Sequence, residues 1–325
     1  MTVFTLVSAS GSPGVTSTAL GLALCWPRPV LLVDADPTGG ASVLAGFLRG
    51  TRTATTGLLH LAIAFRGGYG PQTLPEVTMT LGERVRFVPG TTAHDQARGL
   101  VGLWEPLAGL LRGLDEGGQD VLVDAGRLGL VGSPEPLIAG SDVLLLVCRS
   151  DLVALSAARS WVETLSGTAG GGSALGLLLI EVPGGYCARE VSRFLRVGVV
   201  ARLPWDPAGA AVYGHGAPPP GRRLWRRREP ALQRGLVAAA EAVRAMTAPA
   251  PVSTAGMSTA QVSTAGVLSV GAAAAEGPAD EGSADGVAAG PQASGGEQGS
   301  GSGWSSTGRG MGWVRPVRSG TGGVR

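Results

Sequence analysis

Near its N-terminus the chain reads Ser8-Ala9-Ser10-Gly11-Ser12-Pro13-Gly14-Val15-Thr16-Ser17-Thr18. A short apolar segment, residues 3–7, precedes this stretch, and a run with helical character, residues 19–24, follows it. A strand, a glycine-rich turn, a hydroxyl residue and a helix, in this order, are the layout of a phosphate-binding loop. The backbone N–H groups of such a loop and the N-terminus of its helix attract anionic oxygens. We therefore expect this loop to bind a phosphate group.

The loop lacks the lysine that usually accompanies this layout. Phosphate-binding loops end in Gly-Lys-Ser/Thr, where the lysine reaches the outer phosphates and the hydroxyl binds magnesium. Here Val15 occupies the lysine position, and the sequence of 325 residues contains no lysine. Whatever the loop binds, it binds without an ammonium side chain.

Acidic residues follow two later apolar segments. Residues 30–33 run into Asp34-Ala35-Asp36-Pro37, and residues 121–123 run into Asp124. Carboxylates at the ends of buried strands, facing a glycine-rich loop, can hold magnesium or orient a water molecule. A single aspartate of this kind is more often the cap of a turn, but the loop and both acidic motifs together favour a site.

Apolar and helical segments alternate along the first three quarters of the chain. Segments typical of buried strands are residues 3–7, 30–33, 85–88, 121–123, 143–147, 175–180 and 197–201, and segments with helical spacing are 107–114, 156–165 and 231–246. This alternation predicts an α/β fold with a doubly wound, mostly parallel sheet. In such folds, ligands bind beyond the carboxyl ends of the strands.

The composition changes after residue 246. Residues 247–325 are mostly Ala, Gly, Ser, Thr and Pro, which predicts a disordered tail behind a single domain formed by residues 1–246. The end of the tail is rich in tryptophan and arginine and is either a docking motif or an unconstrained extension. The residues concerned are Trp304, Arg309, Trp313, Arg315, Arg318 and Arg325.

Other classes of protein find little support. Cys25, Cys148 and Cys187 fit neither a disulfide framework nor a zinc site, and we expect buried thiols. The three histidines are scattered, and no nucleophile elbow is present. Neither a signal peptide nor an apolar stretch long enough to cross a membrane is recognisable, so a cytoplasmic protein is expected.

Taken together, these motifs resemble the ParA/MinD family of deviant P-loop ATPases. The family's loop, Lys-Gly-Gly-x-Gly-Lys-Thr-Thr, aligns without a gap with residues 10–17, and its Asp-x-Asp-Pro motif matches residues 34–37. The family's Walker B strand matches residues 121–124, and its Pro-x-Asp turn near the adenine is similar to residues 204–206. The resemblance covers residues 1–246 and implies a P-loop fold that takes ATP or ADP with Mg²⁺.

The resemblance also implies roles for individual residues. Asp36 would orient the water in any hydrolysis, while Thr16 and Asp124 would hold Mg²⁺, Asp124 doing so through a water molecule. The implied nucleotide-binding residues are Gly11, Ser12, Gly14, Val15, Thr16, Ser17, Asp34, Pro204 and Asp206.

Two departures from the family pattern weaken the implied ATPase activity. Ser10 replaces the signature lysine that reaches the partner's nucleotide in the ATP-bound dimer, and Val15 replaces the second lysine. Positioned cations matter greatly in phosphoryl transfer, where related arginine contacts are worth about 10³–10⁵ in rate. We therefore expect weak nucleotide binding by a pseudo-ATPase or a very slow ATPase, unless an arginine from elsewhere completes the site.

Three functions are compatible with these observations. The first is a ParA/MinD-like organising or recruitment protein with a degenerate nucleotide site. Its loop is similar to that of actinobacterial MinD-like proteins, some of which resemble the TadZ/CpaE localisation factors of pilus and secretion systems. This implies a protein partner, allows a homodimer and allows recruitment to a membrane or pole. The second is a slow partitioning ATPase that acts with DNA and a partner protein, and the third is a scaffold that recruits partners through its tail.

The densest positive cluster is the candidate contact for DNA. A basic stretch around a tryptophan can bind DNA phosphates or an anionic membrane surface, although a short arginine run is more often a solvated loop or a protein contact. Its members are Arg222, Arg223, Arg226, Arg227 and Arg228. The following helix, residues 231–246, is expected to pack on the sheet rather than dock on a membrane.

Overall fold

The computed structural model describes residues 2–11, 13–114, 118–169, 173–218 and 230–247. All of them belong to one compact unit, residues 1–255. Ser12, the arginine cluster of residues 222–228 and the predicted disordered tail beyond residue 247 lie outside the described residues.

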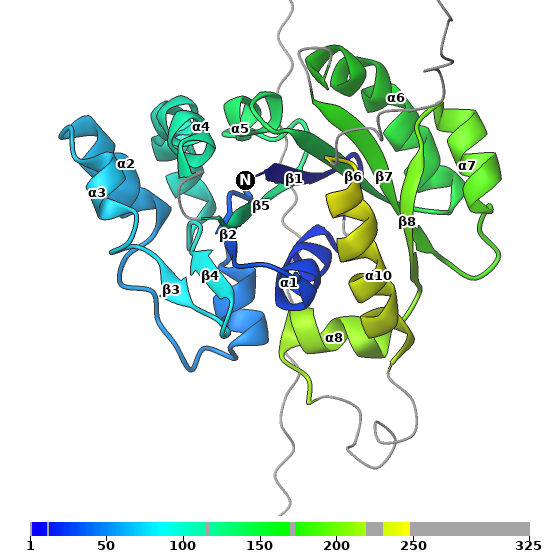
Figure 1. Ribbon diagram of the computed structural model, residues 1–325, viewed down its shortest axis with the longest axis horizontal. Coiled ribbons are helices and arrows are strands. Elements are labelled where there is room, and N and C mark those ends of the chain that lie inside the picture. The colour runs from blue at the N-terminus through cyan, green and yellow to red at the C-terminus, as the bar shows by residue number, and fades with distance from the viewer. Residues whose placement is uncertain (1, 12, 115–117, 170–172, 219–229, 248–325) are drawn as a thin grey trace, which may run out of the picture. The chain divides into compact units, whose positions relative to one another are not determined.

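An eight-stranded sheet forms the centre of this unit (Figure 1). The strands are β1 (Val3–Ser8), β2 (Val30–Asp34), β3 (Met79–Thr80), β4 (Val85–Val88), β5 (Asp120–Arg127), β6 (Val143–Arg149), β7 (Ala174–Glu181) and β8 (Val199–Pro204). Their order is β3-β4-β2-β5-β1-β6-β7-β8, and every neighbouring pair except β3 and β4 is parallel. The predicted doubly wound, mostly parallel sheet is therefore confirmed.

Helices connect the strands and cover both faces of the sheet. The α-helices are α1 (Val15–Cys25), α2 (Leu58–Arg66), α3 (Gly70–Thr73), α4 (Trp104–Arg112), α5 (Glu135–Ala139), α6 (Leu152–Ala169), α7 (Ala188–Leu195), α8 (Pro207–His215) and α10 (Ala231–Ala245). The described residues also form a π-helix, η1 (Val43–Phe47), and a 3₁₀-helix, η2 (His94–Leu103). No helix in the described part of the chain has the length and apolar character needed to cross a membrane.

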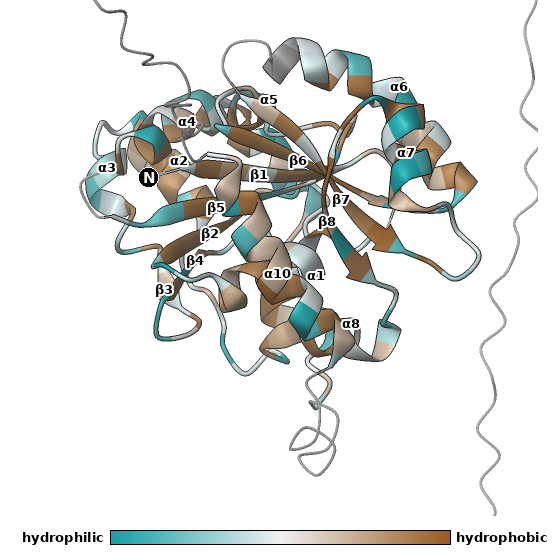
Figure 2. Cartoon of the chain, turned by 45° about the vertical axis from the view of Figure 1, so that its right-hand side comes forward, coloured by the Kyte–Doolittle hydropathy of each residue, from teal (hydrophilic) through white to brown (hydrophobic). Residues whose placement is uncertain are grey.

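The strands send alternate side chains into two separate cores. On β2, Leu31 and Val33 face the core beneath α2, α4, α5, α6 and α7, whereas Val30 and Leu32 face the core beneath α1 and α10. Figure 2 shows the resulting band of apolar strands between the helical layers. Burial on both faces explains why the strand segments are continuous apolar runs rather than alternating ones.

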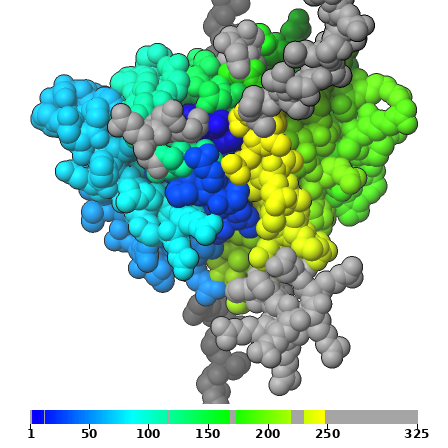
Figure 3. Space-filling view, viewed as in Figure 1, coloured from blue at the N-terminus to red at the C-terminus, as the bar shows by residue number. Residues whose placement is uncertain are grey.

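Helix α10 packs beside α1 on one face of the sheet (Figure 3). Leu232, Leu236 and Val243 of α10 are buried, so the prediction that this helix packs on the sheet is confirmed. Gly21 of α1 lets the two helices approach closely, because a Cβ at this position would lie 2.6 Å from Cδ1 of Leu236.

Two expectations from the sequence need correction. The last strand begins at Val199 rather than at residue 197, because Val197 is buried in the core from the turn after α7 and its apolar character comes from that packing. The cysteines are not all buried: Cys148 is buried, Cys25 is half-buried, and Cys187 is exposed at the N-cap of α7.

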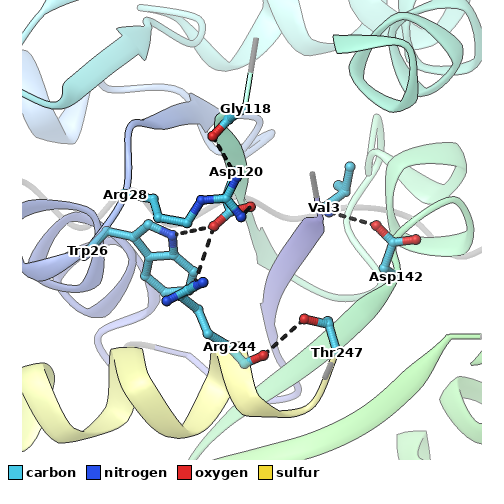
Figure 4. Close-up of polar contacts among 8 residues, drawn as sticks. All are labelled: Val3, Trp26, Arg28, Gly118, Asp120, Asp142, Arg244 and Thr247. Carbon is cyan, nitrogen blue, oxygen red and sulfur yellow. Dashed lines mark hydrogen bonds and ion pairs between the residues drawn. The ribbon is translucent and has the colours of Figure 1, made fainter. Parts of the chain in front are cut away.

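At the amino end of β5, a buried carboxylate holds three segments together (Figure 4). Asp120 is 2% exposed, and its Oδ2 accepts a hydrogen bond of 2.9 Å from Nε1 of Trp26, just after α1. Arg28 Nη1 lies 3.5 Å from Oδ1, and Arg244 Nε lies 3.6 Å from Oδ2. Because Arg244 belongs to α10, this carboxylate ties the end of that helix to the sheet and to the turn that follows α1.

We expect Asp120→Ala to lower the free energy of unfolding by about 2–3 kcal/mol, mainly because the Trp26 indole N–H loses its acceptor. Both arginines are more than a third exposed, so their ion pairs contribute little. Urea unfolding measures the difference. Asp120→Asn keeps an acceptor oxygen and should lower the free energy of unfolding by less. Asp95→Ala, at an exposed position, should change the free energy of unfolding little. Equal stability of Asp120→Ala and wild type would contradict this assignment.

Candidate functional site

The predicted phosphate-binding loop connects the central strand β1 to helix α1. The helix begins at Val15, earlier than the sequence predicts, and Gly14 precedes it in the left-handed region, with φ 91° and ψ 36°. Gly14 has no side chain to cap the first-turn N–H groups, and the first turn contains no acidic residue. The positive end of the α1 dipole is therefore left without a negative side chain of its own, as an anion site requires.

A cavity of about 700 Å³ opens over this loop. Of the residues that the resemblance implies, the cavity is lined by Gly11, Gly14, Val15, Thr16, Ser17 and Asp36. Asp34, Asp124 and Ser10 do not line it. The loop and Asp36 of the Asp34-Ala35-Asp36-Pro37 motif are thus brought together at the carboxyl edge of the sheet, as the sequence predicts.

Asp34 and Asp124 lie side by side beneath the cavity. They are paired in register on β2 and β5, and both are buried. Each also caps a turn: Asp34 Oδ1 accepts from the Asp36 N–H at 3.4 Å, and Asp124 Oδ1 accepts from the Gly126 N–H at 3.1 Å. Asp34 and Asp124 therefore do cap the turns that follow their strands. This capping is compatible with a role of the same two carboxyl groups in a phosphate and magnesium site.

Two glycines leave the space that these carboxylates need. A Cβ at Gly126, whose φ is 64°, would lie 2.4 Å from Cγ of Asp36, and a Cβ at Gly90 would lie 2.8 Å from Cγ of Asp34. The half-buried Asp36 is fixed in turn by the Thr38 N–H, which donates to its Oδ1 at 2.8 Å. The carboxylates are held by backbone groups rather than by cations.

Both buried aspartates have a raised pKa, which favours the protonated, neutral acid. Burial, followed by the negative charges of Asp124 and Asp36, raises the pKa of Asp34 well above its usual value. Burial also raises the pKa of Asp124 to about 7, against the lowering effect of the Thr16 hydroxyl. A cation placed between the loop and these residues would favour their ionised forms.

Asp124 and Thr16 fit a magnesium ion that is held mainly by phosphate and water. Oδ2 of Asp124 is buried and accepts no hydrogen bond from the residues that the structure describes, so one acceptor is left for a metal-bound water. Within the same residues, no group of three or more His, Cys, Asp or Glu side chains is placed to hold a metal. Mg²⁺ usually keeps several waters and takes few protein ligands beside phosphate oxygens, which agrees with such a sparse set.

A smaller, apolar cavity of about 170 Å³ adjoins the first. Pro204 and Asp206 line it, together with Trp205 and the buried Leu203 and Leu236. The two cavities are neighbours, because they share the lining residues Pro13, Gly14, Ser17, Pro207 and Ala210. Asp206 is also the N-cap of α8, since its Oδ1 accepts from the Gly209 N–H at 2.8 Å.

Several residues of the larger cavity were not singled out from the sequence. Those from α8 were missed because residues 207–215 carry no helical periodicity, and Arg127 was missed although it lies three residues after Asp124. The additional lining residues are Ser8, Thr38, Ser42, Gly126, Arg127, Leu130, Pro207, Ala210, Ala211, Gly214 and His215.

Solved structures with this architecture come from the MinD and ParA proteins. MinD of Pyrococcus horikoshii, solved with Mg-ADP, is 19% identical and superposes with a TM-score of 0.58 over 76% of this chain and 97% of its own. A ParA-family ATPase from Chlorobium tepidum is 16% identical, with a TM-score of 0.60 over 74% and 98%. MinD of Aquifex aeolicus in complex with MinC is 14% identical, with a TM-score of 0.57 over 78% and 98%.

These likenesses establish the fold, which is that of the MinD/ParA P-loop ATPases. The fold implied by the sequence resemblance is thereby confirmed. No protein-family model matches the sequence, and no curated protein sequence matches it either. The roles of individual site residues stay predictions.

The raised pKa of Asp124 predicts a pH dependence of stability for the chain without metal or nucleotide. A group whose pKa is raised in the fold binds more protons when folded, so the free energy of unfolding falls as pH rises from about 4 to about 7. The loss is on the order of 2–4 kcal/mol, and the raised pKa of Asp34 acts in the same direction.

Thermal unfolding in chelator between pH 5 and pH 8 measures this effect. In Asp124→Asn the melting temperature should depend less on pH, and at pH 8 it should be higher than that of wild type. Asp95→Asn, at an exposed position, should keep the pH dependence of wild type. An unchanged slope in Asp124→Asn would show that Asp124 is not the responsible group.

Proposed function

We propose that this chain is a nucleotide-responsive organising or recruitment protein that binds an adenine nucleotide weakly and hydrolyses it very slowly or not at all. One observation carries the proposal: the described part of the loop leads through the left-handed Gly14 into the N-terminus of α1, which can attract phosphate, while the side chain at the lysine position is apolar. Val15 is 6% exposed and packs in the core around α1. Its aliphatic side chain carries no charge that could contact a phosphate group.

Binding would depend on backbone groups and on the magnesium ion. The α1 N-terminus faces the larger cavity, and the smaller apolar cavity beside it suits a planar base, which Pro204, Trp205 and Asp206 would contact. Thr16 would bind Mg²⁺ through its hydroxyl and Asp124 through water. When bound, the ion would neutralise phosphate charge next to Asp34 and Asp124.

The structural neighbours support this reading of the site. MinD of Pyrococcus horikoshii holds Mg-ADP, and MinD of Aquifex aeolicus assembles with MinC. By analogy, we propose a protein partner and a homodimer for this chain, and an output that depends on which nucleotide is bound. Service to a pilus or secretion machine is a finer proposal, supported by the loop resemblance alone.

Nucleotide binding can be tested by thermal unfolding of the full chain. Mg-ATP or Mg-ADP at millimolar concentration should raise the melting temperature by a few degrees, because a ligand that binds only the folded state stabilises it by mass action. Chelation of Mg²⁺ and Thr16→Ala should each abolish most of the shift. Thr80→Ala, at an exposed position on β3, is the matched control. Wild type that gains no stability from any adenine nucleotide would refute the proposed function.

Steady-state phosphate release tests the second half of the proposal. Wild type and Asp36→Asn should release phosphate at the same background rate, because positions 10 and 15 of the loop, where the family carries lysine, hold Ser10 and Val15. Val15→Lys should bind Mg-ATP roughly tenfold more tightly through a charge-assisted contact, whereas Val15→Met changes only the shape. Turnover of wild type at about 1 s⁻¹ or faster, lost in Asp36→Asn, would contradict a pseudo-ATPase.

A further inference from the structure

A bulge at the end of β5 sets the position of Arg127. Leu6 of β1 pairs with Asp124 of β5, and Ser8 pairs with Arg127. Between these two pairs β1 advances by two residues and β5 by three, so β5 contains one extra residue. The left-handed Gly126 supplies the extra residue, with φ 64°. Bulges of this kind interrupt the alternation of a strand and redirect a side chain.

The bulge is fixed to the start of the phosphate loop. The Leu128 N–H donates to the Ser8 carbonyl at 2.8 Å, and the Ser8 hydroxyl donates to the Gly126 carbonyl at 3.5 Å. On its other side, the Gly126 backbone lies against the Asp36 carboxylate, which leaves no room for a Cβ. The backbone on either side of Arg127 is therefore held between Ser8, at the start of the loop, and Asp36.

The Arg127 side chain is exposed and lines the larger cavity beside Gly11, Gly14 and Thr16. Among the described residues it forms no ion pair, whereas Arg28, Arg149, Arg202 and Arg244 are each paired with a carboxylate. Apart from Arg127, His215 is the only basic side chain among the described residues that line this cavity. A guanidinium that stays protonated in proteins is thus free to meet a ligand at the loop.

We propose that Arg127 binds the phosphate groups of the nucleotide and supplies the cationic contact that Ser10 and Val15 cannot make. This assignment rests on the proposed function, because it requires a nucleotide in the larger cavity. Its chemistry is a planar fork of N–H donors that matches phosphate oxygens. The charge comes from the strand next to the loop rather than from the loop itself.

The test is the affinity of the full chain for Mg-ATP and Mg-ADP, measured by calorimetry for wild type and three variants. Arg127→Ala should weaken binding of both nucleotides by roughly tenfold or more, the loss expected for a charge-assisted contact. Arg127→Lys should be intermediate, because it keeps the charge and loses the fork. Arg86→Ala, which removes an exposed arginine from β4 outside the cavity, should bind like wild type. Since Arg127 is exposed, its variants should melt like wild type without nucleotide.

Each failure has its own signature. Equal affinities of wild type and Arg127→Ala would overturn the role of Arg127 while leaving the proposed function intact. Wild type that binds neither nucleotide would overturn both. As a further check, tripolyphosphate titrated alone should bind Arg127→Ala more weakly than wild type, and equal affinities would overturn a contact to phosphate.

Discussion

The carboxyl edge of the sheet is organised around two buried carboxyl groups in direct register, Asp34 on β2 and Asp124 on β5. Placing them together in the interior is unfavourable unless backbone donors or a cation compensate. Much of the local geometry follows from this constraint. The turn after each strand folds back to donate an N–H to its aspartate, and glycines at 90 and 126 leave room for acidic side chains.

The same constraint connects the fold to the proposed function. Burial raises the pKa of both aspartates and so shifts them toward the neutral acid in the absence of ligand. Arrival of a magnesium ion with its nucleotide would change their ionisation and the electrostatics of the turns that they cap. The site is therefore suited to respond to a bound ligand, while it lacks the loop cations that make phosphoryl transfer fast. The proposed recruitment of a partner would require a response to the bound ligand but not fast phosphoryl transfer.

Most of the fold could be predicted from the sequence, because its strands are buried on both faces and read as continuous apolar runs. Residues 30–33 and 143–147 show this clearly, whereas the predicted helical run began at residue 19 and missed the first turn of α1, which begins at Val15. Helix α8 was not predictable in the same way: Ala and Gly fill residues 208–211, and its contacts with α1 and η1 depend on the folded chain. The role proposed for Arg127 was not predictable for a related reason, since the direction of its side chain depends on a bulge that only the pairing of β1 with β5 creates.

The most direct measurement is a crystal structure of the full chain with Mg²⁺ and ADP. The account predicts that the phosphates lie against the N–H groups at the start of α1, with Mg²⁺ between a phosphate oxygen and the Thr16 hydroxyl. It also predicts the Arg127 guanidinium within hydrogen-bond distance of a phosphate oxygen. A nucleotide bound away from residues 11–17, or phosphates that touch neither the loop nor Thr16, would contradict it.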